Sequence, residues 1–90
     1  MNERLRAARL AKQSPLGPEF VFSRQELAEA VNSHIYRTTG QMGSLDQNYI
    51  GKLERGEYRW PRADYRAGFR AVLGAATDAE LGFYIKRRLR

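Results

Sequence analysis

The sequence predicts an all-α fold, a compact bundle of five helices that forms a single domain over residues 1–90. Apolar side chains recur at helical spacing in several separate segments. Capping residues precede these segments, and glycine or proline follows them. The chain has 90 residues and no cysteine, so disulfides cannot hold it together. It therefore needs well-packed helices or a partner subunit.

A first helix is expected over residues 3–12, where Leu5 and Leu10 provide a modest inward stripe. Proline and glycine residues directly after it end the helix. The connector that follows, residues 14–22, is apolar at residues 20–22. These side chains can pack back onto the core or pair briefly as an extended strand, and we expect packing.

A second helix is expected to begin directly after Ser23, which forms a capping box with Glu26. Apolar residues recur at helical spacing from Leu27 to Ile35, and the period continues to Thr38. The glycines that follow break the helix. The second helix should therefore run from about residue 24 to about residue 38.

A third, short helix is expected over residues 46–55. Asp46 can accept a backbone N–H as its N-cap, and Gly56 stands where a left-handed stop is favoured. Ile50 and Leu53 lie three residues apart and share one narrow inward stripe. The outward face then carries Gln47, Asn48, Gly51 and Lys52.

The outward face of this third helix has two interpretations. Two adjacent amides that can bond the edge of an adenine precede a small residue and a cation, so the face can lie against the bases of duplex DNA. Plain surface polarity is the alternative, and Lys52 can reach a phosphate as well as a base. We expect base contact.

A fourth helix is expected after Pro61, which suits the first turn of a helix, with Trp60 in the core or as a lid on this helix. A fifth helix, over about residues 78–89, follows the capping box of Thr77 and Glu80. We expect this helix to serve dimerisation or linkage. Its apolar face carries Tyr84, Ile85 and Leu89.

The formal net charge of +6, from 16 basic and 10 acidic residues, attracts polyanions, and nucleic acid is the partner we expect. A membrane surface is a weaker candidate, because the basic residues do not follow one face of a helix with an apolar opposite face. No apolar run approaches the roughly 18 residues that a membrane span needs. We therefore expect no membrane partner.

Catalysis is not expected from this composition. With no cysteine and one histidine, metal sites and nucleophile–histidine pairs have almost no residues to form from. The carboxylates are scattered, and no glycine-rich phosphate loop with its lysine occurs. We expect no enzyme activity, no catalytic residue, no metal site and no cofactor.

Two strings within residues 23–56 are typical of one family: Ser-Arg-Gln-Glu-Leu-Ala, and then Tyr-Ile-Gly-Lys-Leu-Glu-Arg-Gly. Through them the chain resembles the Xre/Cro-repressor family of helix-turn-helix proteins, which have a lambda-repressor-like fold, over roughly residues 5–73. It looks closest to the N-terminal DNA-binding domains of actinobacterial transcriptional regulators, in which Arg-Trp-Pro also follows. The resemblance implies a bacterial protein of the cytoplasm, associated with the nucleoid.

The connection between the second and third helices departs from the family pattern. The family joins these helices by a turn of three or four residues, whereas here residues 32–44 are interposed. The insertion can carry Arg37 toward a DNA phosphate, or it can only lengthen the scaffold.

The resemblance also implies roles for charged residues around the motif. Glu54 would repel phosphate if it pointed outward, so we expect it to point inward and pair with Arg9 of the first helix. Arg24 matches the position that touches phosphate at the edge of the motif. On the expected fourth helix, Arg62, Arg66 and Arg70 recur every four residues and form one ridge, for which a solvated face is the alternative. The arginines expected to bind phosphate are Arg24, Arg37, Arg55, Arg59, Arg62 and Arg66.

The expected function is sequence-specific binding of double-stranded DNA by a transcriptional regulator, with the third helix in the major groove. The resemblance implies a homodimer on a pseudo-palindromic site, and a further C-terminal domain or protein partner can follow. The alternative is a protein-interaction module, antitoxin-like or an adaptor, with only auxiliary DNA contact.

Overall fold

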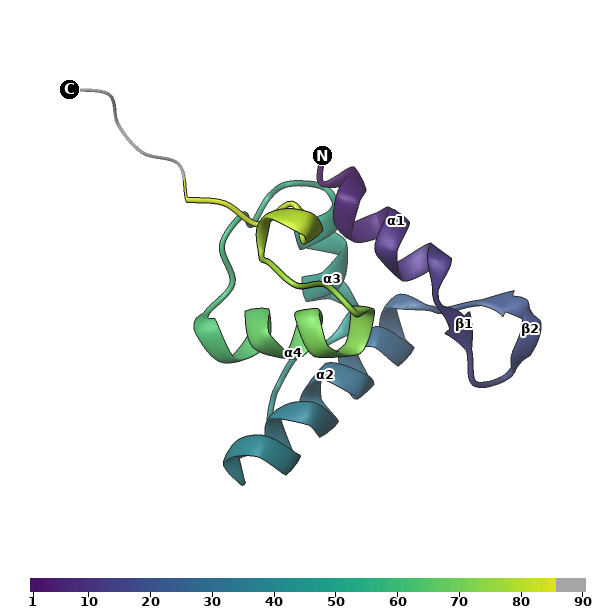
Figure 1. The fold of residues 1–90 in the computed structure, drawn as a ribbon, viewed down its shortest axis with the longest axis horizontal. Helices are drawn as coiled ribbons and strands as arrows, with labels where there is room; N and C mark the ends of the chain where they lie inside the picture. Colours follow the sequence, from purple (N-terminus) through teal and green to yellow (C-terminus); the bar gives the residue numbers. More distant parts are fainter. Residues whose placement is uncertain (86–90) are drawn as a thin grey trace.

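The structure is a computed structural model that describes residues 1–85 (Figure 1). Its described part has four α-helices and one two-stranded antiparallel sheet, and this part is 55% helical and 8% strand. The prediction of an all-α bundle of five helices was therefore wrong. The elements are α1 (Glu3–Ala11), β1 (Gln13–Ser14), β2 (Gly17–Val21), α2 (Arg24–Thr39), α3 (Gln47–Glu54), α4 (Ala63–Leu73) and the 3-10 helix η1 (Ala79–Leu81).

The core lies where α2 packs against both α3 and α4, while α1 contacts α3 and η1. Leu27, Val31 and Phe69 are fully buried there. Gly68 allows α4 to approach α2 closely, because a Cβ atom at this position would lie 2.8 Å from Cγ1 of Val31. One apolar cluster thus joins all four helices and η1.

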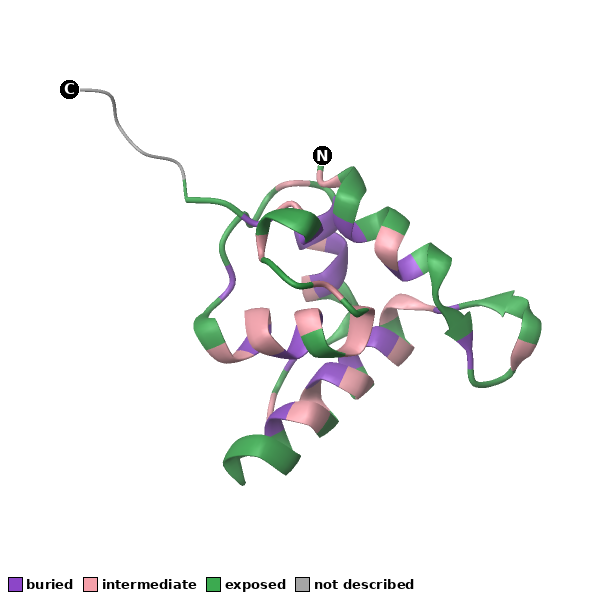
Figure 2. Ribbon diagram, in the orientation of Figure 1, coloured by how far each residue is buried: buried purple, intermediate pink, exposed green. Residues whose placement is uncertain are grey.

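Helix α2 matches its prediction closely. The Ser23 side chain accepts from the Glu26 N–H and the Glu26 carboxylate accepts from the Ser23 N–H, both at 3.0 Å, which forms the expected capping box. Gly40, with φ of +74°, ends the helix in the left-handed conformation. Figure 2 shows the last turn of α2 exposed to solvent, beyond the part that packs on the core.

The connector after α1 pairs as a hairpin instead of packing on the core. β1 and β2 are antiparallel, and Figure 1 shows them projecting from the body beside α1. In an extended chain successive side chains point to opposite sides, so residues 20–22 cannot all face inward. Only Phe22 is buried, whereas Phe20 and Val21 are 49% and 61% exposed.

The hairpin is attached to α2 by a buried hydroxyl. The Ser14 hydroxyl donates to the Glu26 carboxylate at 2.8 Å and accepts from the Leu16 N–H at 3.1 Å. The same Glu26 carboxylate caps α2, so one carboxylate fixes both the hairpin and the start of the helix. Hydrogen bonds to Ser23 and Ser14 lower the pKa of Glu26 below its usual value.

The predicted fifth helix is absent from the described residues. The Thr77–Glu80 capping box does form, with two reciprocal bonds of 3.2 Å, but it opens only the single turn of η1. Gly82, with φ of +72°, ends that turn against Asn2, whose amide donates to the Leu81 carbonyl at 2.8 Å.

Beyond η1 the chain is not helical up to residue 85. Phe83 is buried, whereas Tyr84 and Ile85 are 52% and 55% exposed. Leu89, the remaining residue of the predicted apolar face, lies outside the described residues. Two other boundaries also differ: α1 ends at Ala11, and Pro61 precedes α4 instead of forming its first turn.

Candidate nucleic-acid interface

The inward face of α3 is anchored in the core. Ile50 and Leu53 are fully buried, as their spacing predicts. The Asp46 carboxylate caps the helix by accepting from the Tyr49 N–H at 2.8 Å. Gly56 follows with φ of +81°, which turns the chain away from the helix. The orientation of α3 is thereby fixed, and its remaining face points outward.

The expected ion pair between Arg9 and Glu54 is present below this face. The Arg9 Nε and Nη2 atoms lie 2.7 and 3.2 Å from the two Glu54 carboxylate oxygens, and Arg9 also donates to the Phe22 carbonyl at 2.9 Å. Glu54 is only 2% exposed. Such a pair is held by several charge-assisted bonds, so removing either partner leaves a buried charge.

Arg24 joins the same carboxylate from the start of α2. Its Nη2 atom lies 3.1 Å from Oε1 of Glu54, and 42% of its side chain is exposed. The Glu54 carboxylate therefore binds two arginines. It neutralises only one of their charges, so the three side chains together keep one positive charge, and Arg24 is the partly exposed member. The sequence alone did not indicate that Arg24 has an intramolecular partner.

Gln47 and Asn48 lie exposed on the outward face of α3. Neither side-chain amide forms a hydrogen bond with another residue in the part of the chain that the structure describes. Lys52 is half-buried, with its Nζ atom 5.4 Å from the centre of the Tyr58 ring. The two amides are thus free to bond an external partner, and the lysine lies toward the end of the helix.

Gly51 is not exposed, contrary to the prediction that it belongs to the accessible outward face. It is buried, and a Cβ atom at this position would be 3.0 Å from the Nη1 atom of Arg55. The Arg55 guanidinium covers the glycine, which explains why a small residue occurs here. Arg55 follows Gly51 by four residues, so helical spacing places both on one side, and the long side chain covers the small one.

Four of the arginines predicted to bind phosphate are exposed: three follow α3, and Arg37 lies in the last turn of α2. Arg55 pairs with Glu57 at 2.5 Å. Arg62 pairs with Asp64 at 2.6 Å and stacks on Tyr65 with its guanidinium carbon 4.1 Å from the ring centre. Arg37 and Arg59 are also exposed, and neither has an ion-pair partner among residues 1–85. Pairs between exposed groups are weak, so these arginines remain able to exchange partners.

Arg66 differs from the other arginines, and its predicted phosphate contact is not supported. Only 17% of its side chain is exposed. It donates to the Pro61 carbonyl at 2.8 Å and pairs with Asp78 at 2.9 Å, where Arg70 also binds. Burial alone would raise the pKa of Asp78, but hydrogen bonds from Arg66 and Arg70 outweigh it and lower that pKa.

The connection from α2 to α3 is shorter than the sequence indicated, because residues 32–39 belong to α2. The Asn32 amide fixes the end of this connection by donating to the Leu45 carbonyl at 2.8 Å and accepting from the Leu45 N–H at 3.0 Å. A Cβ atom at Gly43 would lie 2.4 Å from Oδ1 of Asn32, so only glycine fits there. This role of Asn32 was not predicted, although a polar residue within an apolar helical period was its signal.

Other kinds of site receive no support from the described residues. Within residues 1–85, no three metal-ligating side chains come together. In the same part of the chain, none of the helices has the length and apolar character needed to cross a bilayer. Comparison of the chain with protein-family models, with curated proteins and with solved structures finds no match.

Proposed function

We propose that this protein binds double-stranded DNA sequence-specifically, as a transcriptional regulator of the Xre-like helix-turn-helix type, in the bacterial cytoplasm at the nucleoid. One observation carries the proposal: the unpaired amides of Gln47 and Asn48 stand on the outward face of a short helix. The back of that helix is fixed by a buried ion pair at Glu54. A rigid helix with free amides is suited to the major groove.

Sequence would be read by Gln47 and Asn48, since an amide can bond an adenine edge through two hydrogen bonds. Lys52 would reach a base or a phosphate near the end of the helix. Arg24, Arg55, Arg59 and Arg62 would position the helix on the phosphate backbone. The net charge of +6 favours this association at low salt.

A homodimer on a pseudo-palindromic site follows from the small footprint of α3, which has eight residues. Such a helix contacts only a few base pairs, and two related half-sites give the specificity that one lacks. The test is a selection of bound sequences from random duplex DNA. An enriched motif with two-fold symmetry is the expected result, and recovery of random sequences would contradict the proposal.

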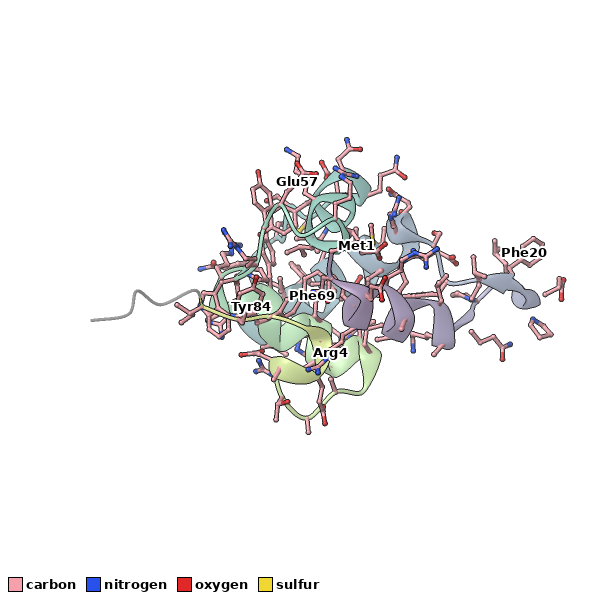
Figure 3. The ribbon with its side chains drawn as sticks, turned by 90° about the horizontal axis from the view of Figure 1, so that it is seen from above. Met1, Arg4, Phe20, Glu57, Phe69 and Tyr84 are labelled. Atoms are coloured by element: carbon pink, nitrogen blue, oxygen red, sulfur yellow. The ribbon has the colours of Figure 1, made fainter. Side chains whose placement is uncertain are left out.

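A protein-interaction module remains the second candidate, and the hairpin favours it. Leu16, Phe20 and Val21 of the hairpin are 71%, 49% and 61% exposed. Figure 3 shows Phe20 at the end of the molecule opposite Tyr84. Exposed apolar groups gathered on one element are typical of docking surfaces. A salt titration on duplex DNA separates the candidates, because a DNA reader shows a steep loss of affinity with salt whereas an adaptor binds DNA weakly throughout.

A further inference from the structure

An open groove of about 540 Å³ lies beside the end of α3. One wall is the segment that leaves α3, and the other is the chain after η1. The Tyr84 N–H donates to the Arg59 carbonyl at 3.1 Å and ties the two walls together. We call this the aromatic groove, and its main lining residues are Tyr49, Glu57, Tyr58, Arg59, Trp60 and Tyr84.

Trp60 forms a prepared stacking surface in the aromatic groove. The Arg66 guanidinium covers one face of the indole, with its central carbon 3.8 Å from the ring centre. Arg66 is itself fixed by the Pro61 carbonyl and by Asp78. Trp60 is nevertheless 40% exposed and lines the groove. The indole is therefore held on one face by Arg66, while part of the side chain stays accessible in the groove.

The tyrosines on the α3 side are also held. The Tyr49 and Tyr58 rings lie 5.2 Å apart between centres, and the Lys52 ammonium lies over Tyr58. Burial raises the pKa of the Tyr49 hydroxyl, so this group stays neutral at physiological pH. Because Tyr49 belongs to α3, a ligand in the aromatic groove would touch the helix proposed to read DNA.

The charge of the aromatic groove favours an anion. Its one carboxylate, on Glu57, is already bound by Arg55 at 2.5 Å. Arg59 is exposed and has no ion-pair partner among the described residues. A cation beside aromatic rings suits a flat ring that carries a carboxylate, and the volume falls in the usual range for small-molecule sites.

We propose that the aromatic groove binds a planar aromatic carboxylate, with its ring stacked on Trp60 and its carboxylate bound to Arg59. Figure 3 shows Glu57 and Tyr84, two of the residues that line this groove. A ligand that occupies Arg59 removes a proposed phosphate contact, so it weakens DNA binding. This regulatory part rests on the proposed function, whereas the binding part does not.

The experiment uses 2-naphthoate as probe and the neutral 2-naphthamide as its matched control. Trp60 is the only tryptophan, so its indole N–H gives a single NMR signal that reports on the groove. Titration with 2-naphthoate should shift this signal saturably, and 2-naphthamide should bind about tenfold more weakly because it lacks the charge-assisted bond. Arg59→Ala should reduce the affinity for 2-naphthoate to that for the amide.

Two aromatic variants locate the site. Tyr84→Ala should weaken the binding of 2-naphthoate, whereas Tyr36→Ala should not change it, although both tyrosines are more than half exposed. Equal affinity for the acid and the amide, or equal effects of the two tyrosine variants, would overturn the binding proposal. Far-UV circular dichroism checks that each variant keeps its helices.

The regulatory part is tested with the selected DNA site. Saturating 2-naphthoate should weaken DNA binding by the wild type several-fold and should not change DNA binding by Arg59→Ala. DNA should in turn weaken the binding of the probe to the wild type by the same factor. Probe binding together with no DNA binding would overturn the proposed function and leave the groove assignment standing. Binding of both without mutual effect would overturn the regulation alone.

Discussion

The two faces of α3 have opposite properties, although both are formed by the same eight-residue helix. On the inward face, Leu53 is fully buried and Glu54 is bound by two arginines. On the outward face, Gln47 and Asn48 are exposed and form no side-chain hydrogen bond within residues 1–85. The inward residues hold the helix, and the outward ones are left for a partner. Stability and binding should therefore respond to different substitutions within one helix.

The largest expected effect is on the inward face. Glu54→Ala leaves Arg9 buried without its partner, and breaking such a pair costs about 3–5 kcal/mol of unfolding free energy. Glu57→Ala is the matched control, because its pair with Arg55 is exposed and worth about 0–1 kcal/mol. Urea unfolding followed by circular dichroism measures both. If the two variants unfolded alike, the buried network would not be what fixes α3.

A second test compares two asparagines that differ only in their surroundings. Asn32→Ala removes both bonds to the Leu45 backbone and leaves a half-buried N–H and carbonyl unpaired, at a cost of about 1–3 kcal/mol. Asn48→Ala removes an exposed amide and should change stability by less than about 0.5 kcal/mol. Equal losses in thermal unfolding would mean that Asn48 has a structural role.

Two arginines four residues apart, beyond α3, show the same contrast between a residue that holds the fold and one left for a partner. Arg62→Ala should reduce the slope of log affinity against log salt by about one unit, with little effect on unfolding. Arg66→Ala should leave the slope unchanged and lower stability, because its guanidinium is bound to Pro61 and Asp78. DNA titrations at several salt concentrations decide between them, and equal slopes for both variants would refute the distinction.

The smallest expected effect concerns pH. The folded protein holds the pKa of Asp78 below its usual value, so this carboxylate adds stability above its unfolded pKa of about 3.9. The contribution is lost as the pH falls through the lower folded value. Asp78→Asn should therefore be less stable than the wild type at pH 7, and the difference should shrink as the pH falls below the unfolded pKa and vanish below the folded one. A difference that is constant with pH would show that the charge is not responsible.

Local signals predicted α2 and α3 well because their capping residues and glycines lie next to the helices that they limit. The same kind of signal failed at Thr77, where the capping box forms but Gly82 and its contact with Asn2 stop the helix after one turn. That contact joins residues 79 positions apart in a bond that local periodicity cannot reveal. Packing was expected instead of the hairpin for a related reason, since an apolar run such as residues 20–22 does not indicate which side chain faces the core.

The candidate site shows the same division. The pairing of Glu54 with Arg9 was expected from the family resemblance and from the cost of an outward acid beside phosphate. The difference in exposure between Arg62 and Arg66 was not expected, because the helical period places both on one ridge. What separates them is Asp78, which approaches from beyond α4 and binds only the second.

The central claim is that the outward face of α3 reads sequence, and the most direct test measures a ratio of affinities. Dissociation constants are determined for the wild type, Gln47→Ala and Asn48→Ala on the selected DNA site and on random duplex at one salt concentration. Each substitution should cost about 1–3 kcal/mol on the selected site and little on random DNA, with unfolding unchanged. Equal losses on both kinds of DNA would contradict the claim, because these amides would then not distinguish bases.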